Sequence, residues 1–437
     1  MADSTSLSLK ADQDDRISDL PDALIHRILS FLPTKMVVAT SLLSKRWVSV
    51  WTSVPALDFH DSYIYRRCLE AKMKFMQFVY NALLRNKSGS VERFRLHCNA
   101  NYGQSCINAW ICSAAVDRGL QEADISVSKA GGEESLLKLP SGLFLVKTLK
   151  ILKLEGDIMV DLRGPISLPS LKILHLRLVN YANDECLGSL LSGCLVLQEL
   201  VVVERKTVNL NISSPSLESL SLTTIGSTSS QHKVKVNIDA PALKQFKLQT
   251  QIKLDLYVNL SCLITADIMG GSQGGTQLLA ALSRVKSLRF LRIDHLAFAV
   301  AAGSFPSFVN LTRLELYNAN WVVVSQFLQH SNKLETLDVG TSMMFTKLIP
   351  GVNCWTQPDE VPLCFMSCLT KSVEDNGNTH RNIFVFRFKA LHSQEIVDDV
   401  QVLADLSTLI QMKAQFLILM AWVRSSSVHF PSGFLAM

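Results

Sequence analysis

A leucine pattern, L-x-x-L-x-L, recurs through the middle of the chain and strongly limits the folds open to it. Successive copies begin 22, 26, 20, 26, 45, 23 and 23 residues apart. A pattern that returns about every 20 to 29 residues predicts one structural unit per copy, stacked because no single copy can bury its apolar side. The copies are Leu149/Leu152/Leu154, Leu171/Leu174/Leu176, Leu197/Leu200/Val202, Leu217/Leu220/Leu222, Leu243/Phe246/Leu248, Leu288/Leu291/Ile293, Leu311/Leu314/Leu316 and Leu334/Leu337/Val339.

The spacing is that of an irregular leucine-rich repeat solenoid of the α/β class, predicted for residues 149–345. Each x-L-x-L-x forms one short parallel strand whose leucines face the core. The long interval holds a weaker copy at Leu260/Leu263. Residues 61–148 are interpreted as a linker helix and two degenerate leading copies, Val91/Phe94/Leu96 and Leu120/Ala123/Ile125.

Residues between the leucines of each strand face away from the core and form the candidate surface for a target. They mix both charge signs with aromatic rings, which suits a protein better than a nucleic acid. Phe290 and Asp338 are expected on the same surface. Most such residues in any solenoid are simply solvated, because few residues carry the energy of an interface. The candidates for target contact are Lys153, His175, Arg177, Lys247, Arg292, Arg313, Glu315 and Tyr317.

The N-terminal region predicts three short helices within about forty residues. Asp19 and Pro21 mark the start of the first helix and Pro33 its end. Thr34 can cap the second, and Ser41 or Ser44 can begin the third. An apolar stripe at helical spacing follows the first helix and consists of Ile17, Leu20, Leu24, Ile25, Ile28, Leu29 and Leu32.

This bundle is too small to bury all its apolar side chains on itself, since domains of roughly 40 residues usually need support from outside. The stripe therefore favours a surface that binds a partner protein. An ordinary small helical domain, in which the stripe is its own core, is the alternative.

Three segments of this module, DLPDAL at 19–24, ILSFLPTK at 28–35 and LSKRW at 43–47, closely resemble the F-box of plant F-box/LRR/FBD proteins. The resemblance places a flexible N-terminus at 1–14 and the F-box at 15–60. It implies binding to a Skp-type adaptor and, through it, to a cullin, while Trp47 and Trp51 brace the module. The residues that it assigns to adaptor binding are Leu20, Pro21, Ile25, Ile28, Leu29, Leu32, Pro33 and Leu43.

The C-terminal segment begins with Asn353-Cys354-Trp355, Val361-Pro362 and Cys364, which resemble the start of the FBD domain of the same family. Residues 353–437 are therefore interpreted as a small, divergent α+β FBD-like end. Alternation predicts a strand over Phe384 to Leu391, and helical spacing predicts a helix over Ile396 to Ile410.

Several classes of function lack support in the sequence. A net charge of +5 without a run of Lys and Arg gives no nucleic-acid patch. The apolar stretch Phe416 to Val423 is far shorter than the roughly 20 residues needed to cross a membrane. Gly270 to Gly275 is not followed by Lys-Ser/Thr, and the cysteines form no paired zinc-ligand motif. No cofactor and no metal are expected, and the cysteines are interpreted as reduced core thiols of a cytoplasmic or nuclear protein.

These observations lead to the hypothesis of a substrate-recognition subunit of an SCF-type cullin ubiquitin ligase, which binds an unknown protein substrate through its repeats. Such a subunit is a non-catalytic adaptor. The alternative is a leucine-rich repeat scaffold or receptor that acts outside a ubiquitin ligase. A hydrolase or transferase that uses one of the cysteines has no motif behind it.

Overall fold

The computed structural model describes residues 20–61, 69–98, 102–115, 118–128, 136–162, 164–205, 209–225, 234–250, 254–270, 275–291, 305–317, 321–342, 370–371 and 383–389. The chain divides into two compact units, Met1–Val285 and Lys286–Met437, which are described separately. No helix within the described ranges is long and apolar enough to cross a membrane.

Helices occur mainly in the first third of the N-terminal unit. The α-helices are α1 (Asp22–Leu29), α2 (Thr34–Ala39), α3 (Lys45–Val50), α4 (Leu69–Arg85), α5 (Gln104–Ala115), α6 (Cys186–Ser192), α7 (Gly275–Ala281) and, in the second unit, α9 (Trp321–Gln329). Short 3-10 helices cover Thr40–Leu42, Trp51–Ser53 and Ser141–Leu145.

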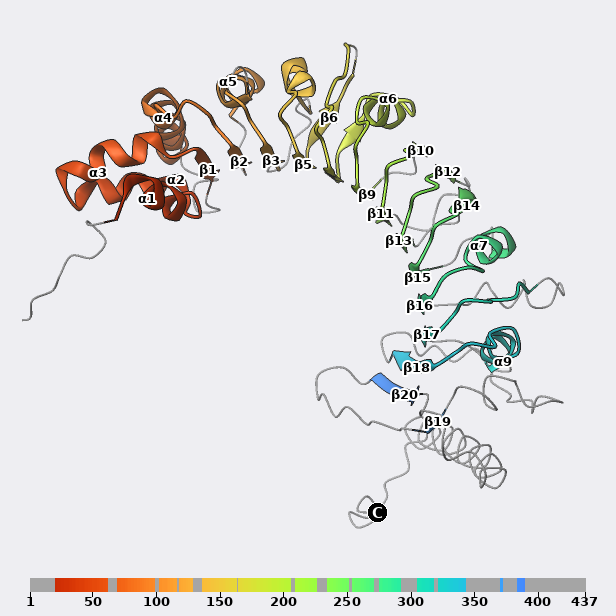
Figure 1. Ribbon diagram of the computed structural model, residues 1–437. Helices are drawn as coiled ribbons and strands as arrows, with labels where there is room; N and C mark the ends of the chain where they lie inside the picture. Colours follow the sequence, from red (N-terminus) through yellow and green to blue (C-terminus); the bar gives the residue numbers. More distant parts are fainter. Residues whose placement is uncertain are drawn as a thin grey trace, which may run out of the picture. The chain divides into compact units, whose positions relative to one another are not determined.

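The main sheet of the N-terminal unit is parallel throughout, in the order β1-β2-β3-β5-β7-β9-β11-β13-β15. The even labels from β4 to β14 are missing from this order because those strands form two other sheets. Figure 1 shows the main strands side by side in chain order. The strands are β1 (Ala56–His60), β2 (Arg93–Cys98), β3 (Glu122–Val127), β5 (Ile151–Gly156), β7 (Ile173–Arg177), β9 (Glu199–Glu204), β11 (Ser219–Thr224), β13 (Gln245–Gln249) and β15 (Thr265–Met269).

Successive repeats differ in the segment that follows the main strand. Helices α4, α5 and α6 follow some of the strands, and short strands follow others (Figure 1). These short strands pair into two small parallel sheets, β4-β6-β8 and β10-β12-β14. Their bounds are β4 (Leu137–Lys138), β6 (Ile158–Val160), β8 (Asn180–Tyr181), β10 (Leu210–Ser213), β12 (Val234–Asp239) and β14 (Leu254–Asn259). The unequal connections account for the irregular repeat length.

The leucines of the repeat pattern form the core, as the sequence predicts. Leu152, Leu174 and Leu200 are completely buried, and the same motif position is buried in the other repeats of this unit. Burying one such side chain contributes about 1.5 to 3 kcal/mol, and each strand of the stack buries one or two of them. The fold is therefore an N-terminal helical module followed by a parallel leucine-rich repeat sheet.

The array starts earlier than residue 149. The two leading copies form β2 and β3, with Phe94 and Ile125 buried like the later leucines. One further copy, Val54/Leu57/Phe59, was missed in the sequence because it directly follows the third helix; it forms β1, which pairs with β2. The helical module is thus joined to the sheet without an intervening linker.

The long interval in the repeat pattern contains two regular copies. Leu263 lies just before β15, Ala266 and Ile268 lie on it, and all three are buried. A full repeat therefore exists here, but Leu263 takes its first position, whereas the predicted weak copy Leu260/Leu263 placed it second. In the next copy, too, the predicted register was wrong by three residues. Leu288 and Phe290 are buried whereas Leu291 is half-buried, so that copy is Val285/Leu288/Phe290.

In the C-terminal unit, three parallel strands continue the repeat pattern: β16 (Ser287–Leu291), β17 (Arg313–Tyr317) and β18 (Thr336–Ser342). Strand β20 (Ile383–Lys389) then pairs antiparallel with β18, and β19 (Thr370–Lys371) pairs with β20. The strand predicted over Phe384 to Leu391 is confirmed in position. The remainder of the FBD-like segment, including the helix predicted over Ile396 to Ile410, lies outside the described residues, as do Ile17 and the N-terminus at 1–14.

One carboxyl group lies inside the repeat core. Glu204, at the end of β9, is buried with 4% of its surface exposed, next to Tyr181 of β8. Burial raises the pKa of Glu204 to about 7, and the Tyr181 hydroxyl lowers it only in part. In an unfolded chain a Glu titrates near roughly 4.3, so the folded chain holds this proton over the intervening pH range.

The buried Glu204 is expected to make stability fall as the pH rises from about 4.3 to 7. Glu204→Gln should remove this loss and stabilise the chain by about 3 to 4 kcal/mol at pH 8, against only about 1 kcal/mol at pH 5. Urea unfolding at both pH values measures it, with Glu155→Gln, an exposed position, as the matched control. Equal stability of Glu204→Gln and the unmodified chain at pH 8 would contradict the assignment.

Candidate functional site

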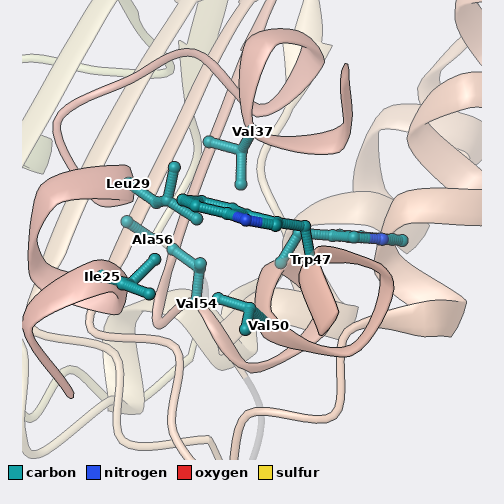
Figure 2. Packing of buried hydrophobic residues seen from close by; sticks show 8 residues of the cluster. Ile25, Leu29, Val37, Trp47, Val50, Val54 and Ala56 are labelled. Atoms are coloured by element: carbon teal, nitrogen blue, oxygen red, sulfur yellow. The ribbon is translucent and has the colours of Figure 1, made fainter. Parts of the chain in front are cut away.

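The N-terminal module has a small, closed core to which all three helices contribute. Figure 2 shows its side chains converging from α1, α2, α3 and the segment that leads into β1. The core consists of Ile25, Leu29, Val37, Trp47, Val50, Trp51, Val54 and Ala56, with Leu20, Leu32 and Val38 packed at its edge. Trp47 and Trp51 are both buried here, so they brace the module as the resemblance implies.

A second set of apolar side chains in the same module faces outward. Ile28 of α1 is 52% exposed, and Leu42 in the 3-10 helix after α2 is 88% exposed. So many large apolar side chains are seldom left exposed on one small module, and exposed apolar residues in such number indicate an interaction surface. The outward apolar residues are called the F-box surface and comprise Leu24, Ile28, Phe31, Met36, Leu42, Leu43 and Val48.

The eight residues predicted to bind an adaptor do not share one environment. Pro21, Ile28, Pro33 and Leu43 are exposed and available to a partner. Leu20 and Leu32 are partly buried and pack against the core. Ile25 and Leu29 are buried, so the expectation that they touch the adaptor is wrong: they are core residues that hold the F-box surface in place.

Sequence reasoning overlooked Phe31, Met36, Leu42 and Val48 as surface residues. The available signal was that α1 is apolar at two i, i+4 pairs, of which Ile25/Leu29 faces inward and Leu24/Ile28 outward. A helix that is apolar on both sides must be covered on both sides. The core of the module covers one of them.

Polar contacts fix the relative positions of the helices. The Arg46 guanidinium of α3 donates a hydrogen bond to the Leu20 carbonyl oxygen, with a Nη2–O distance of 2.6 Å, and pairs with the Asp22 carboxylate at the start of α1. Thr34 does not cap α2 as expected, because Pro33 occupies the capping position. The Thr34 hydroxyl instead accepts a hydrogen bond from the Asp58 backbone N–H, which joins α2 to β1.

Outward side chains of the main sheet form the second candidate surface, here called the strand face. In the N-terminal unit it carries ion pairs between neighbouring strands. Arg95 of β2 pairs with Asp58 of β1 at 3.1 Å and with Asp124 of β3 at 3.2 Å. His175 of β7 contacts Glu199 of β9, with 2.7 Å between Nε2 and Oε1. Lys153, Arg177 and Lys247 also lie on this face, as predicted from the alternation.

The strand face of the C-terminal unit is largely self-neutralised. Glu315 pairs with Arg313 at 2.8 Å and with Arg289 at 3.2 Å, and the Arg289 guanidinium lies over the Tyr317 ring at 5.5 Å from its centroid. Two expectations fail here. Phe290 points into the core. Asp338 lies on β18, the strand that pairs with β20, and is buried beside Arg313. Arg292 lies outside the described residues.

The described residues offer little for covalent or metal chemistry. Burial raises the pKa of the Cys98 thiol well above its usual range and that of Cys194 to about 12, which disfavours the reactive thiolate. Over the same residues, no group of three or more His, Cys, Asp or Glu side chains is placed to hold a metal ion. The two surfaces that stand out both suit protein contacts.

Comparison with known proteins agrees with this division of the chain. The model of the F-box domain matches residues 17–58. A model described as the LRR repeats of the FBD-associated F-box protein At5g56370 matches residues 107–265. No solved structure matches the chain.

Curated relatives extend the similarity over most of the chain. The F-box/FBD/LRR-repeat protein At4g00160 of Arabidopsis thaliana is 34% identical over 366 residues, which cover 81% of this chain and 78% of the relative. The F-box/FBD/LRR-repeat protein At4g26340 of the same plant is 35% identical over 369 residues, 81% of this chain and 84% of the relative. The chain therefore belongs to the F-box/FBD/LRR-repeat family and is an F-box protein.

Proposed function

We propose that this F-box protein is the substrate-recognition subunit of an SCF-type cullin ubiquitin ligase. Its F-box surface binds a Skp-type adaptor, which links it to a cullin, and its strand face binds a protein substrate. The observation that carries the proposal is the exposed apolar F-box surface on a module whose own core is already complete. The family membership supports the same partner class.

The F-box surface is large enough to hold a partner. Covering an exposed Leu, Ile, Phe or Met side chain contributes about 1.5 to 3 kcal/mol, so six such residues give a gross gain of roughly 10 kcal/mol or more. Part of this gain is offset by the loss of translational, rotational and side-chain freedom on association. The supporting contacts from Arg46 and Thr34 reduce that loss, because they hold the helices in place before binding.

The chain's contribution to ubiquitin transfer is positional in this proposal. Holding the substrate and the cullin complex together raises the effective concentration of the activated ubiquitin at the substrate's lysines. The bond-forming chemistry belongs to other subunits, which agrees with the unreactive buried thiols Cys98 and Cys194. Free, buried cysteines also support our proposal of a cytoplasmic or nuclear location, which a fluorescent fusion in plant cells would test.

Size-exclusion chromatography with light scattering tests the assembly. The purified chain, a plant Skp-type adaptor and the N-terminal part of a cullin are expected to elute as one complex with one copy of each. Separate elution of the chain and the adaptor would overturn the proposal. In that case the repeats would act as a scaffold or receptor outside a ubiquitin ligase.

A further inference from the structure

Most cations on the strand face of the N-terminal unit are already neutralised. Arg93 pairs with Glu122 at 2.9 Å, Arg95 with Asp58 and Asp124, and Lys247 with Asp267 at 3.9 Å. Lys153 of β5 and Arg177 of β7 are different, because neither makes an ion pair within the described part of the chain. Cations without an internal partner are the ones free to neutralise a ligand.

These two cations belong to a larger basic group on adjacent strands. Lys150 and Lys172 directly precede β5 and β7, and both are exposed. They are neighbours, because the Lys172 backbone N–H donates to the Lys150 carbonyl oxygen at 2.8 Å. Lys153 lies opposite His175 in the strand register, and Arg177 opposite Glu155. Lys150, Lys153, Lys172 and Arg177 together are called the β5–β7 basic patch.

Spacing within the patch favours several single negative charges over one multiply charged group. At about 3.3 Å per residue, Lys172 and Arg177 are roughly 16 Å apart along the strand, and Lys150 and Lys153 roughly 10 Å. A lone phosphate cannot reach both ends. An extended peptide of about five residues covers this length and can place a carboxylate at each cation.

Apolar side chains lie inside the patch. Ile151 and Ile173 face each other across β5 and β7, are half-buried, and separate the cations at the start of the strands from those farther along. The patch also has Glu155 beside Arg177, and the His175 imidazole inside it is held by Glu199 of β9. Both features disfavour RNA as the ligand and favour a peptide that combines acidic with aliphatic residues.

We propose that the β5–β7 basic patch recognises a short extended segment of a protein substrate in which Asp or Glu residues flank an aliphatic side chain. This inference rests on the proposed function, since it names the substrate class of the strand face. Carboxylates would pair with Lys150, Lys153, Lys172 and Arg177, and the aliphatic side chain would pack on Ile151 and Ile173. His175, which lies opposite Lys153 inside the patch, is held by Glu199 of β9.

A displayed library of random ten-residue peptides, selected on the full chain in complex with a Skp-type adaptor, tests the inference. Selected peptides are expected to carry two or more Asp or Glu residues within five positions, next to Val, Ile or Leu. Lys153→Gln with Arg177→Gln should weaken binding of a selected, fluorescein-labelled peptide about fivefold to thirtyfold, because each exposed charge pair contributes modestly. The matched control, Lys87→Gln with Lys235→Gln, removes two exposed lysines elsewhere and should bind normally.

Selection of peptides without acidic residues, or equal binding to the patch variant, would overturn the inference. Binding of a labelled oligouridine is measured in parallel. If oligouridine binds the unmodified chain but not the patch variant, and no peptide is selected, the patch is an RNA site and the inference is overturned. Adaptor binding, followed in the same preparations, keeps the two proposals apart. If the adaptor stays bound and no acidic peptide is selected, only the substrate class fails. If the adaptor fails to bind the chain but acidic peptides still bind the chain alone, only the ligase role fails.

Discussion

Ile28→Asp combined with Leu43→Asp is expected to weaken binding of a Skp-type adaptor by at least about 100-fold. Both side chains belong to the F-box surface, and Ile28 is 52% and Leu43 68% exposed, so the substitutions leave the core of the module intact. An Asp at an apolar contact loses the burial energy of the original side chain and leaves a charge facing an apolar partner. Isothermal titration of the adaptor into each variant measures the effect.

Leu195→Asp provides a matched control, because Leu195 is equally exposed at 72% but lies in the repeats, just before β9. It should bind the adaptor normally. Ile25→Ala gives the opposite contrast: it should lower stability by about 2 to 5 kcal/mol, since Ile25 is 1% exposed in the F-box core. Normal adaptor affinity of the Ile28/Leu43 variant would place the adaptor on another surface.

Gly156→Ala is expected to destabilise the N-terminal unit by about 3 kcal/mol or more. Gly156 ends β5 with φ of +96°, where the chain turns so that the Asp157 N–H donates to the Val127 carbonyl oxygen at 2.7 Å. A Cβ at residue 156 would overlap that same carbonyl group. The backbone must therefore shift, and the parallel pairing of β3 with β5 is weakened with it.

Gly103→Ala separates the two causes of this loss. Gly103 also has a positive φ, +81°, but a Cβ there would meet no atom within 4 Å. Backbone strain alone should cost about 1 kcal/mol. Urea unfolding of both variants measures the difference, and equal destabilisation would show that the contact with Val127 is unimportant.

The repeat fold was predictable from the sequence because its period is fixed by burial. Any strand in this sheet must place an apolar residue at each inward position, and this requirement makes even the degenerate copies on β2 and β3 recognisable in the sequence. The same rule failed at β16, because Leu288 is buried and Leu291, three residues later, is also a leucine but only half-buried. There the alternation allows two registers, and only packing against neighbouring strands decides between them.

The candidate sites were less predictable. An apolar residue in a short helix can face the core or a partner, and the sequence does not distinguish Ile25 from Ile28. The closed packing of α1 on Trp47 and Val50 makes that distinction. The ion pairs on the strand face of the N-terminal unit were unpredictable for a similar reason, since they join residues 20 to 37 positions apart in the chain. The free cations Lys153 and Arg177 become apparent only after these pairs are assigned.

Hydrogen–deuterium exchange of the chain with and without a Skp-type adaptor tests the central claim most directly, because it maps where the adaptor binds. The proposed function predicts slower exchange of backbone amides in α1, α2 and the 3-10 helix Thr40–Leu42, with exchange on β5 to β15 unchanged. The strand face would then remain free for a substrate while the adaptor is bound. Protection on β5 to β15, or no protection of the F-box helices, would contradict the division of the chain into an adaptor-binding end and a substrate-binding sheet.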